Sequence, residues 1–265
     1  MKTLIIISLI FFPSTCLYSQ ILVYGDSRSN ENIHKEIIKK ITNCNPVAVF
    51  NTGDLVFWSQ SKANWKSFID ATADLRSKVP YYPVLGNHEK KSSEFYKVFN
   101  LPNNETWYYI TIQNIGLIVI NSNEKLTSGT KQFQWLEKQL DVSQQTKDYT
   151  IVMLHHPPFS SGSHVEDPMK MQNIIVPLFE KYGVDAVFSG HNHMYERLYA
   201  NGINYFITGG GGAPLHKSKH KSSYSQKVVI CYNYCKIIKN KNNLCVTAYN
   251  INDSIIDSIN IFPKQ

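Results

Sequence analysis

Short apolar runs alternate with amphipathic stretches through residues 21–189. The run ILVYG at 21–25 is typical of a strand, and in the following segment, 32–41, the apolar positions recur at helical spacing. The same alternation predicts further elements of both kinds along the chain. Strands are expected at 47–51, 81–85, 107–112, 117–121, 150–154 and 186–189, and helices at 65–75, 131–140 and 169–182.

Beyond residue 193 the pattern changes to short strands with no helix between them. These strands are expected at 203–208, 227–237, 244–251 and 254–262, and the polar sequence KNKNN at 239–243 predicts a hairpin turn. Alternating strands and helices followed by a β-rich part predict an α/β fold, in which two β-sheets pack face to face as a sandwich flanked by helices. No repeat or linker interrupts residues 20–265, so they are expected to form one domain.

Residues 1–19 have the pattern of an export signal. Lys2 gives a positive start, residues 4–12 are apolar, and Pro13 begins a short polar stretch. The apolar run is much shorter than the roughly 20 residues that span a bilayer, so cleavage near Ser19 is expected and no membrane span would remain. The mature protein would then be exported to the periplasm, the cell surface or the medium. A buried N-terminal strand and a lipid-attached Cys16 are the alternatives.

The composition indicates one substantial core and a basic surface. The 265 residues are 43% hydrophobic and carry a net charge of +7, which attracts phosphate-bearing molecules. The basic sequence HKSKHKSSYSQK at 216–227 is interpreted as a solvated loop, in preference to a nucleic-acid or substrate-steering patch, because Tyr224 is its one aromatic residue. No nucleic-acid partner is expected, and the oligomeric state stays open.

Four cysteines follow the predicted cleavage site. They are Cys44, Cys231, Cys235 and Cys245. An even number in an exported chain permits disulfides, but four cysteines allow three pairings. The last three lie in an expected C-terminal hairpin, where a cross-strand bridge and simple burial are equal alternatives. The spacing of the four cysteines fits no zinc-finger pattern.

Five of the predicted strands end in a short polar cluster. In chain order the clusters are GDSR from Gly25, GDLV from Gly53, GNHE from Gly86, HHPP from His155 and GHNH from Gly190. Each alone has an ordinary explanation, since Asp26 can cap a helix, Asn87 can lie in a turn and His155 can be a core histidine. Together they supply oxygen and nitrogen donors that suit Mn²⁺, Zn²⁺ and Fe, at strand ends only about 5 Å apart. The sequence therefore predicts a metal site at one sheet edge.

The series GD, GD, GNHE, HH and GHxH, in this order and at these spacings, resembles the calcineurin-like metallophosphoesterase superfamily. The segment GHNHMYER at 190–197 further resembles the purple acid phosphatase branch. The resemblance spans residues 21–197 and implies that the later β-rich part completes the second sheet. It also implies a centre of two metal ions, of uncertain identity among Fe, Mn and Zn, bridged by Asp54. The remaining ligands that it implies are Asp26 and His193 for the first metal, and Asn87, His155 and His191 for the second.

The resemblance also implies a mechanism, in which a metal-activated hydroxide attacks phosphorus in line with the leaving group. Two cations that share a carboxylate lie about 3.5 to 4 Å apart, clamp the phosphoryl oxygens and lower the pKa of a bridging water. His88 is implied to contact the phosphate or protonate the leaving oxygen. His164 lies in a loop where purple acid phosphatases place substrate-facing histidines, with a plain surface histidine as the alternative. The residues expected to fix turns, orient the metal-binding histidines or pack locally are His156, Asn192, Tyr195, Glu196 and Arg197.

Two positions at the first metal depart from the family pattern. Most of the superfamily has histidine where this chain has Arg28, and purple acid phosphatases have tyrosine where it has Phe57. Guanidinium stays protonated and phenyl has no donor atom, so neither supplies the missing ligand. The first metal is then bound more weakly, completed by water or absent, and Arg28 becomes a candidate for binding phosphate.

The leading functional hypothesis is hydrolysis of small phosphate monoesters outside the cytoplasm. The same metal pair would also serve a phosphodiesterase acting on nucleotides or lipid head groups. A metal- or phosphate-binding protein without turnover is the hypothesis from a different class, and it would follow from an empty first site.

Overall fold

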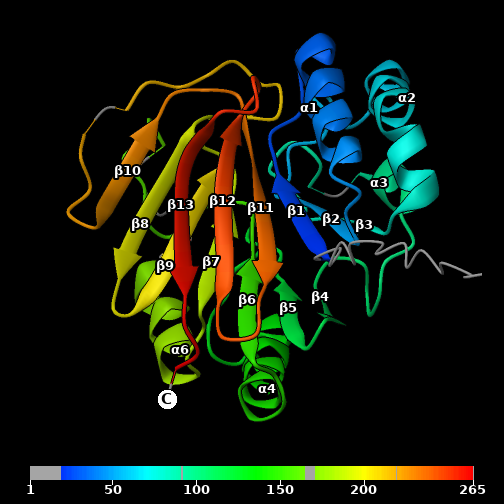
Figure 1. Ribbon diagram of the computed structural model, residues 1–265. Helices are drawn as coiled ribbons and strands as arrows, with labels where there is room; N and C mark the ends of the chain where they lie inside the picture. Colours follow the sequence, from blue (N-terminus) through cyan, green and yellow to red (C-terminus); the bar gives the residue numbers. More distant parts are fainter. Residues whose placement is uncertain (1–18, 91, 165–170, 219, 265) are drawn as a thin grey trace, which may run out of the picture.

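The computed structural model describes residues 19–90, 92–164, 171–218 and 220–264, and it contains two β-sheets with helices outside them (Figure 1). The first sheet has the strands β1 (Gln20–Tyr24), β2 (Ala48–Asn51), β3 (Tyr81–Pro83), β11 (Asn233–Lys239), β12 (Leu244–Asn250) and β13 (Ile255–Ile261), in the spatial order β13-β12-β11-β1-β2-β3. The second has β4 (Tyr108–Ile112), β5 (Ile115–Val119), β6 (Tyr149–Met153), β7 (Ala186–Ser189), β8 (Tyr195–Ala200), β9 (Ile203–Thr208) and β10 (Ser225–Val229), in the order β10-β8-β9-β7-β6-β5-β4. The predicted α/β sandwich is confirmed.

Six helices lie among the described residues, and three of them begin at a side-chain cap. Asn30, Ser61 and Thr130 each accept a hydrogen bond from a backbone N–H of the first helical turn. The helices are α1 (Glu31–Asn43), α2 (Lys62–Lys78), α3 (Ser93–Val98), α4 (Lys131–Thr146), α5 (Met171–Ile174) and α6 (Val176–Lys181).

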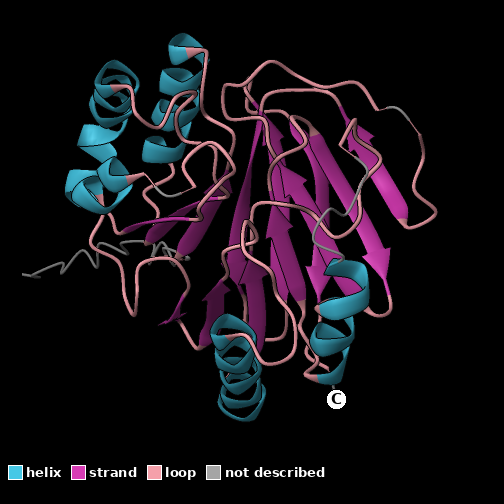
Figure 2. Ribbon diagram, turned by 180° about the vertical axis from the view of Figure 1, so that it is seen from behind, coloured by secondary structure: helices cyan, strands magenta, loops and turns pink. Residues whose placement is uncertain are grey.

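The core fills the space between the sheets and continues under the helices. Val23 and Phe50 of the first sheet belong to the same buried cluster as Ile151 and Phe188 of the second, and this cluster reaches α1 and α2. A second cluster lies between the outer face of the seven-stranded sheet and the helices α4 and α6 (Figure 2). Burial on both faces explains why the central strands read as continuous apolar runs.

Parallel pairing brings the polar clusters to one edge of the molecule. The strands β1, β2 and β3 run parallel to one another, as do β6 and β7. Each of the five polar clusters follows the carboxyl end of one of these strands. Carboxyl ends of neighbouring parallel strands lie at the same sheet edge, so loops distant in the sequence share one crevice.

The structure corrects three expectations in the C-terminal half. The prediction of a single strand at 227–237 is wrong. β10 ends at Val229, β11 begins at Asn233, and the two strands belong to different sheets. The strands of the β-rich part do not all belong to the second sheet. β8, β9 and β10 lie in it, whereas β11, β12 and β13 extend the first sheet. The expected strands also omitted β8, where Glu196 and Arg197 interrupt the apolar pattern.

The predicted helix at 169–182 is divided, and its residues 169 and 170 lie outside the described part. A helix break follows Ile174, and Pro177 lies in the first turn of α6. Proline lacks a backbone N–H, so it is tolerated at a helix start but not within a continuous helix. The short helix α3 was not predicted.

The export signal predicted at 1–19 lies outside the described residues, except for Ser19 itself. Within the described part, no helix is both long and apolar enough to cross a bilayer. There the cysteines at 44, 231, 235 and 245 are all unpaired, and Cys235 is buried. For Cys235 the structure therefore favours simple burial over a disulfide.

A buried histidine, His34 of α1, is part of the core next to the first sheet. Its ring lies between the rings of Tyr24 and Phe68, with centroid distances of 5.8 and 5.6 Å. The His34 Nε2 atom lies 3.1 Å from the Tyr24 hydroxyl, which in turn lies 2.6 Å from the Tyr81 hydroxyl. Burial lowers the pKa of His34 from 6.5 to about 3, so the folded protein holds a neutral imidazole.

This pKa shift predicts acid sensitivity of the fold. The unfolded chain binds a proton at His34 more readily than the folded one, so the free energy of unfolding should fall as the pH drops from 6.5 towards about 3. In His34→Phe this loss, on the order of 4 kcal/mol across the window, should disappear. Urea unfolding at a series of pH values measures the slope. His220→Gln, at an exposed site, is the matched control, and an unchanged acid slope in His34→Phe would contradict the assignment.

Candidate metal centre

All six residues predicted as metal ligands meet in the crevice formed by the strand ends. Ligand atoms of Asp26, Asp54 and His193 lie within 4.8 Å of one another, and this group is called the first set. The second set consists of Asn87, His155 and His191. The Asn87 Oδ1 atom lies 2.8 Å from His155 Nε2 and 3.0 Å from His191 Nδ1.

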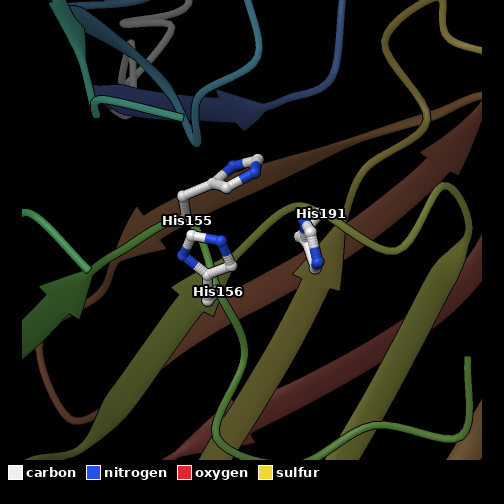
Figure 3. Close-up of side chains that lie close together, drawn as sticks. All are labelled: His155, His156 and His191. Atoms are coloured by element: carbon white, nitrogen blue, oxygen red, sulfur yellow. The ribbon is translucent and has the colours of Figure 1, made fainter. Parts of the chain in front are cut away.

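His156 also belongs to the cluster around the second set. The donor nitrogens of His155, His156 and His191 lie within 4.8 Å of one another, and the three rings gather at the strand ends (Figure 3). The His156 Nδ1 atom lies 2.9 Å from Ser122 Oγ, and its backbone N–H donates to the same oxygen. Both contacts agree with the expectation that His156 fixes its turn.

The first set contains two carboxylates that are almost completely buried. Asp26 is 0% exposed and Asp54 is 1% exposed. Burial, and secondarily the neighbouring Asp54, raises the pKa of Asp26 well above its usual range. The backbone N–H of His191 donates to both carboxylate oxygens of Asp26, at 3.1 and 3.0 Å. A cation at this position would offset the remaining cost of burying the two charges.

His155 directs a lone pair at the oxygens of the second set. His155 Nδ1 donates to the Thr52 carbonyl at 2.8 Å, so His155 Nε2 carries the lone pair that faces Asn87 Oδ1. Asp54 Oδ1 is a further acceptor, 3.4 Å from the same Nε2 atom. Burial lowers the pKa of both His155 and His191, which keeps their imidazoles neutral. The His155 lone pair and the Asn87 and Asp54 oxygens that face it repel one another unless a cation lies between them, so this set fits a metal ion.

Three of the predicted ligands have strained backbone conformations. Asp26, Asp54 and His191 have φ angles of 57°, 57° and 67°, in the left-handed region that non-glycine residues rarely adopt. Such conformations cost about 1 to 3 kcal/mol each and persist where surrounding structure enforces them. A Cβ atom at Gly86 would lie 2.2 Å from the Asp54 nitrogen, which explains the glycine before Asn87.

Glu89, the last residue of GNHE, is a positioning residue that the sequence analysis did not assign. Its buried carboxylate accepts hydrogen bonds from the backbone N–H groups of Asp54, Val56 and Gly86, at 3.0, 3.1 and 3.0 Å. These bonds join the loop after β2 to the loop after β3. Burial, followed by the charge of Asp54, raises the pKa of Glu89 to about 8. The sequence signal that could have identified Glu89 is its place as an acidic residue in GNHE, two residues after the predicted ligand Asn87.

The three residues predicted to act on substrate also lie at the centre. The His88 Nδ1 atom donates to the Phe57 carbonyl at 2.6 Å, and its Nε2 atom lies 3.7 Å from Asp54 Oδ2. Arg28 Nε donates to Asp54 Oδ2 at 3.3 Å. His164 lies beside the second set, with its ring centroid 4.7 Å from that of His191.

Asn192 holds the backbone of His164 at both ends. The Asn192 Oδ1 atom accepts from the His164 N–H at 3.1 Å, and its Nδ2 atom donates to the His164 carbonyl at 3.2 Å. His164 is exposed, yet its main chain is fixed. Asn192 therefore positions a predicted substrate-facing histidine rather than the two GHNH histidines.

His216 is a residue of the centre that the sequence analysis missed. Its ring stacks on that of His193 at a centroid distance of 3.8 Å and lies 5.1 Å from the ring of His164. Burial lowers the pKa of His216 to about 4. The described residues of 217–224 are mostly exposed, as expected for a solvated loop, whereas the prediction of a loop is wrong for residues 225–227, because they belong to β10.

The residues after GHNH pack locally and do not orient the histidines. The Tyr195 hydroxyl and the Arg197 Nε atom both donate to Asp257 Oδ2 of β13, at 2.9 and 2.6 Å. Glu196 accepts from the backbone N–H and hydroxyl of Ser161 at 2.8 and 2.6 Å. These bonds hold β8 to Asp257 of β13 and to Ser161. They favour local packing of residues 195–197 over a role in orienting His191 and His193.

A polar pocket of about 570 Å³ opens beside the second set. Its wall includes Asn87, His88 and His156, together with Tyr96 and Asn123. A phosphoryl group held at the strand ends would therefore have room beside it for a small leaving group.

Comparison with known proteins gives consistent results. The sequence model of the calcineurin-like phosphoesterase family matches residues 19–195. Purple acid phosphatase 18 of Arabidopsis thaliana is 28% identical over 62% of this chain and 41% of its own length. The probable inactive purple acid phosphatase 1 of the same plant is 27% identical over 77% of this chain and 43% of its own length. The chain thus spans about two fifths of the length of these curated relatives.

A solved structure shares the fold. Purple acid phosphatase PPD1 from yellow lupin (Lupinus luteus) seeds has a TM-score of 0.81 and 21% sequence identity, over 92% of this chain and 53% of that one. The family match on this chain extends from the first polar cluster, GDSR, to the last, GHNH. With five strand-end clusters inside the matched segment and two sheets arranged as in a purple acid phosphatase, the chain belongs to the calcineurin-like phosphoesterases.

Proposed function

We propose that this protein hydrolyses phosphate monoesters at a centre that holds two metal ions. The observation that supports the proposal is the convergence of two donor sets, the first buried and the second partly buried, with Asp54 beside both. The Asp54 Oδ1 atom faces His155 of the second set, and Asp54 also belongs to the first. When bound, metal ions of the Fe, Mn or Zn type would supply an activated water for in-line attack and positive charge at the phosphoryl oxygens.

The remaining roles fall to side chains around the two sets. His88 has its Nδ1 atom fixed by the Phe57 carbonyl, and its Nε2 atom faces the centre, so it would contact a phosphoryl oxygen or protonate the leaving oxygen. His164, held by Asn192 and lying beside His191, would do the same. Arg28 supplies a permanent charge for the phosphoryl group. The pocket beside Asn87 and His88 would take a small leaving group.

Binding without turnover is the second candidate, favoured by one observation. Arg28, a cation, contacts the first set, where the family pattern expects a ligand. In addition, one relative, purple acid phosphatase 1 of Arabidopsis thaliana, is described as probably inactive. Phosphodiester hydrolysis remains an outcome of the substrate test.

We also propose that residues 20–265 act as the catalytic domain of an exported protein, after removal of residues 1–19. The positive start and short apolar run support this. Protein recovered from outside the cytoplasm should begin near Gln20 when its mass is measured. An intact Met1 on a soluble cytoplasmic form would overturn the export proposal.

Removal of metal should abolish hydrolysis. After chelation, turnover of p-nitrophenyl phosphate should fall to background, because neither the activated water nor the charge at phosphorus remains. Adding back Mn²⁺, Zn²⁺ or Fe should restore it. Bis(p-nitrophenyl) phosphate and nucleotides, assayed in parallel, separate monoesterase from diesterase activity. Undiminished turnover in a fully stripped sample would refute metal dependence.

Substitutions should separate ligands from residues that act on substrate. Asp54→Ala should lower both metal content and rate most, because Asp54 contacts both sets. His164→Ala should keep the metal content of the wild type and lower kcat by roughly 100- to 10,000-fold if it transfers the proton. Elemental analysis and steady-state kinetics measure the two effects. His220→Ala serves as the control, and a near-normal rate with normal metal content in Asp54→Ala would show that the bridge is misassigned.

A further inference from the structure

The guanidinium of Arg28 lies within the first set and contacts two of its three members. Arg28 Nε donates to Asp54 Oδ2 at 3.3 Å, and Arg28 Nη2 lies 3.4 Å from His193 Nε2. The side chain is only 14% exposed. One fixed cation of the chain therefore faces the atoms that would bind the first metal.

The tautomer of His193 makes the second contact a hydrogen bond in which Arg28 is the donor. His193 Nδ1 donates to the Pro214 carbonyl at 2.6 Å, so His193 Nε2 carries the lone pair. Guanidinium is donor-only and stays protonated at all accessible pH values. The lone pair that a metal ion would need is thus the one that Arg28 engages.

Arg28 is held in this position from several directions. Its backbone N–H donates to the Asp54 carbonyl at 3.3 Å, and its Nη1 atom donates to Ser29 Oγ at 3.3 Å. The Phe57 ring lies against the guanidinium, with the Cζ atom 5.5 Å from the ring centroid. A cation stacked on an aromatic ring gains electrostatic stabilisation. The second set differs, because the His155 lone pair on Nε2 faces the Asn87 Oδ1 atom at 2.8 Å rather than a guanidinium.

We propose that Arg28 makes the two metal sites unequal. Its guanidinium partly replaces the first metal by neutralising Asp54 and engaging His193, so the protein retains one metal ion tightly at the second set. A second ion binds the first set only by displacing Arg28, and does so more weakly because the guanidinium repels it and competes for its ligands. This inference rests on the metal centre of the proposed function and adds a residue that determines its occupancy.

Mn²⁺ binding measures this inequality without any assay of turnover. Metal-stripped full-length mature protein is titrated with Mn²⁺ by calorimetry, and bound manganese is counted after dialysis. Wild type should show one tight site and one site weaker by roughly 10- to 100-fold. Arg28→Gln, which removes the charge and keeps much of the length, should strengthen the weaker site by a similar factor. Electron paramagnetic resonance should then show spin coupling between two Mn²⁺ ions at lower manganese concentration than in wild type.

Two further variants isolate the charge as the cause. Arg28→Lys keeps a positive side chain and should leave the sites unequal. Arg76→Gln is the matched control, because Arg76 also stacks on a ring, with its Cζ atom 4.9 Å from the Phe99 centroid, but lies on α2 outside the centre. It should bind Mn²⁺ as the wild type does. Circular dichroism confirms that each variant is folded.

The outcomes separate this inference from the proposed function. Two equal sites in wild type, no change in folded Arg28→Gln, or equal sites in Arg28→Lys would each overturn the role of Arg28, whatever the enzyme hydrolyses. Unequal sites that respond to Arg28→Gln, in a protein that turns over no phosphate ester, would support the inference and overturn the proposed phosphatase activity. Absence of Mn²⁺ binding in every variant would overturn both.

Discussion

Two carboxylates, Asp26 and Asp54, lie buried side by side at the carboxyl ends of β1 and β2. Removing charge from water costs several kcal/mol per ion unless opposite charge or hydrogen-bond donors replace the lost hydration. Backbone N–H groups of His191 and His88 supply part of that replacement. The guanidinium of Arg28 supplies another part, and bound metal would supply the rest. The surrounding crevice is organised by this need for positive charge.

The two-sheet scaffold makes such a site tolerable. Left-handed backbone at Asp26, Asp54 and His191 is unfavourable by itself and survives because the adjoining strands are packed on both faces. Glu89 adds a buried acceptor that binds three backbone N–H groups of two different loops. Glu89 thereby holds the loops after β2 and β3, which carry Asp54 and Asn87, in a fixed relation to each other.

The chain belongs to the calcineurin-like phosphoesterases, and Arg28 and Phe57 depart from the pattern that its resemblance to that family implies. The first set combines two acids and a histidine with a cation, Arg28, that contacts two of these three, whereas in the second set Asn87 Oδ1 lies beside nitrogens of His155 and His191. Both a phosphatase and a probable inactive phosphatase are among the relatives.

Local features of the sequence predicted the five strands that end in polar clusters and the donor residues that follow them, but not β8, α3 or the break between α5 and α6. The strand at ILVYG and the turn at Asp26 can be predicted from a few residues, because strand formation and the turn that follows depend on near neighbours in the sequence. Contacts across the chain could not be obtained in this way. His216 stacks on His193, Arg28 reaches His193 over a separation of 165 residues, and β10 and β11 separate into different sheets within one apolar stretch. Only the tertiary structure decides these, because they depend on how the two sheets pack and on which loops that packing brings to the same edge.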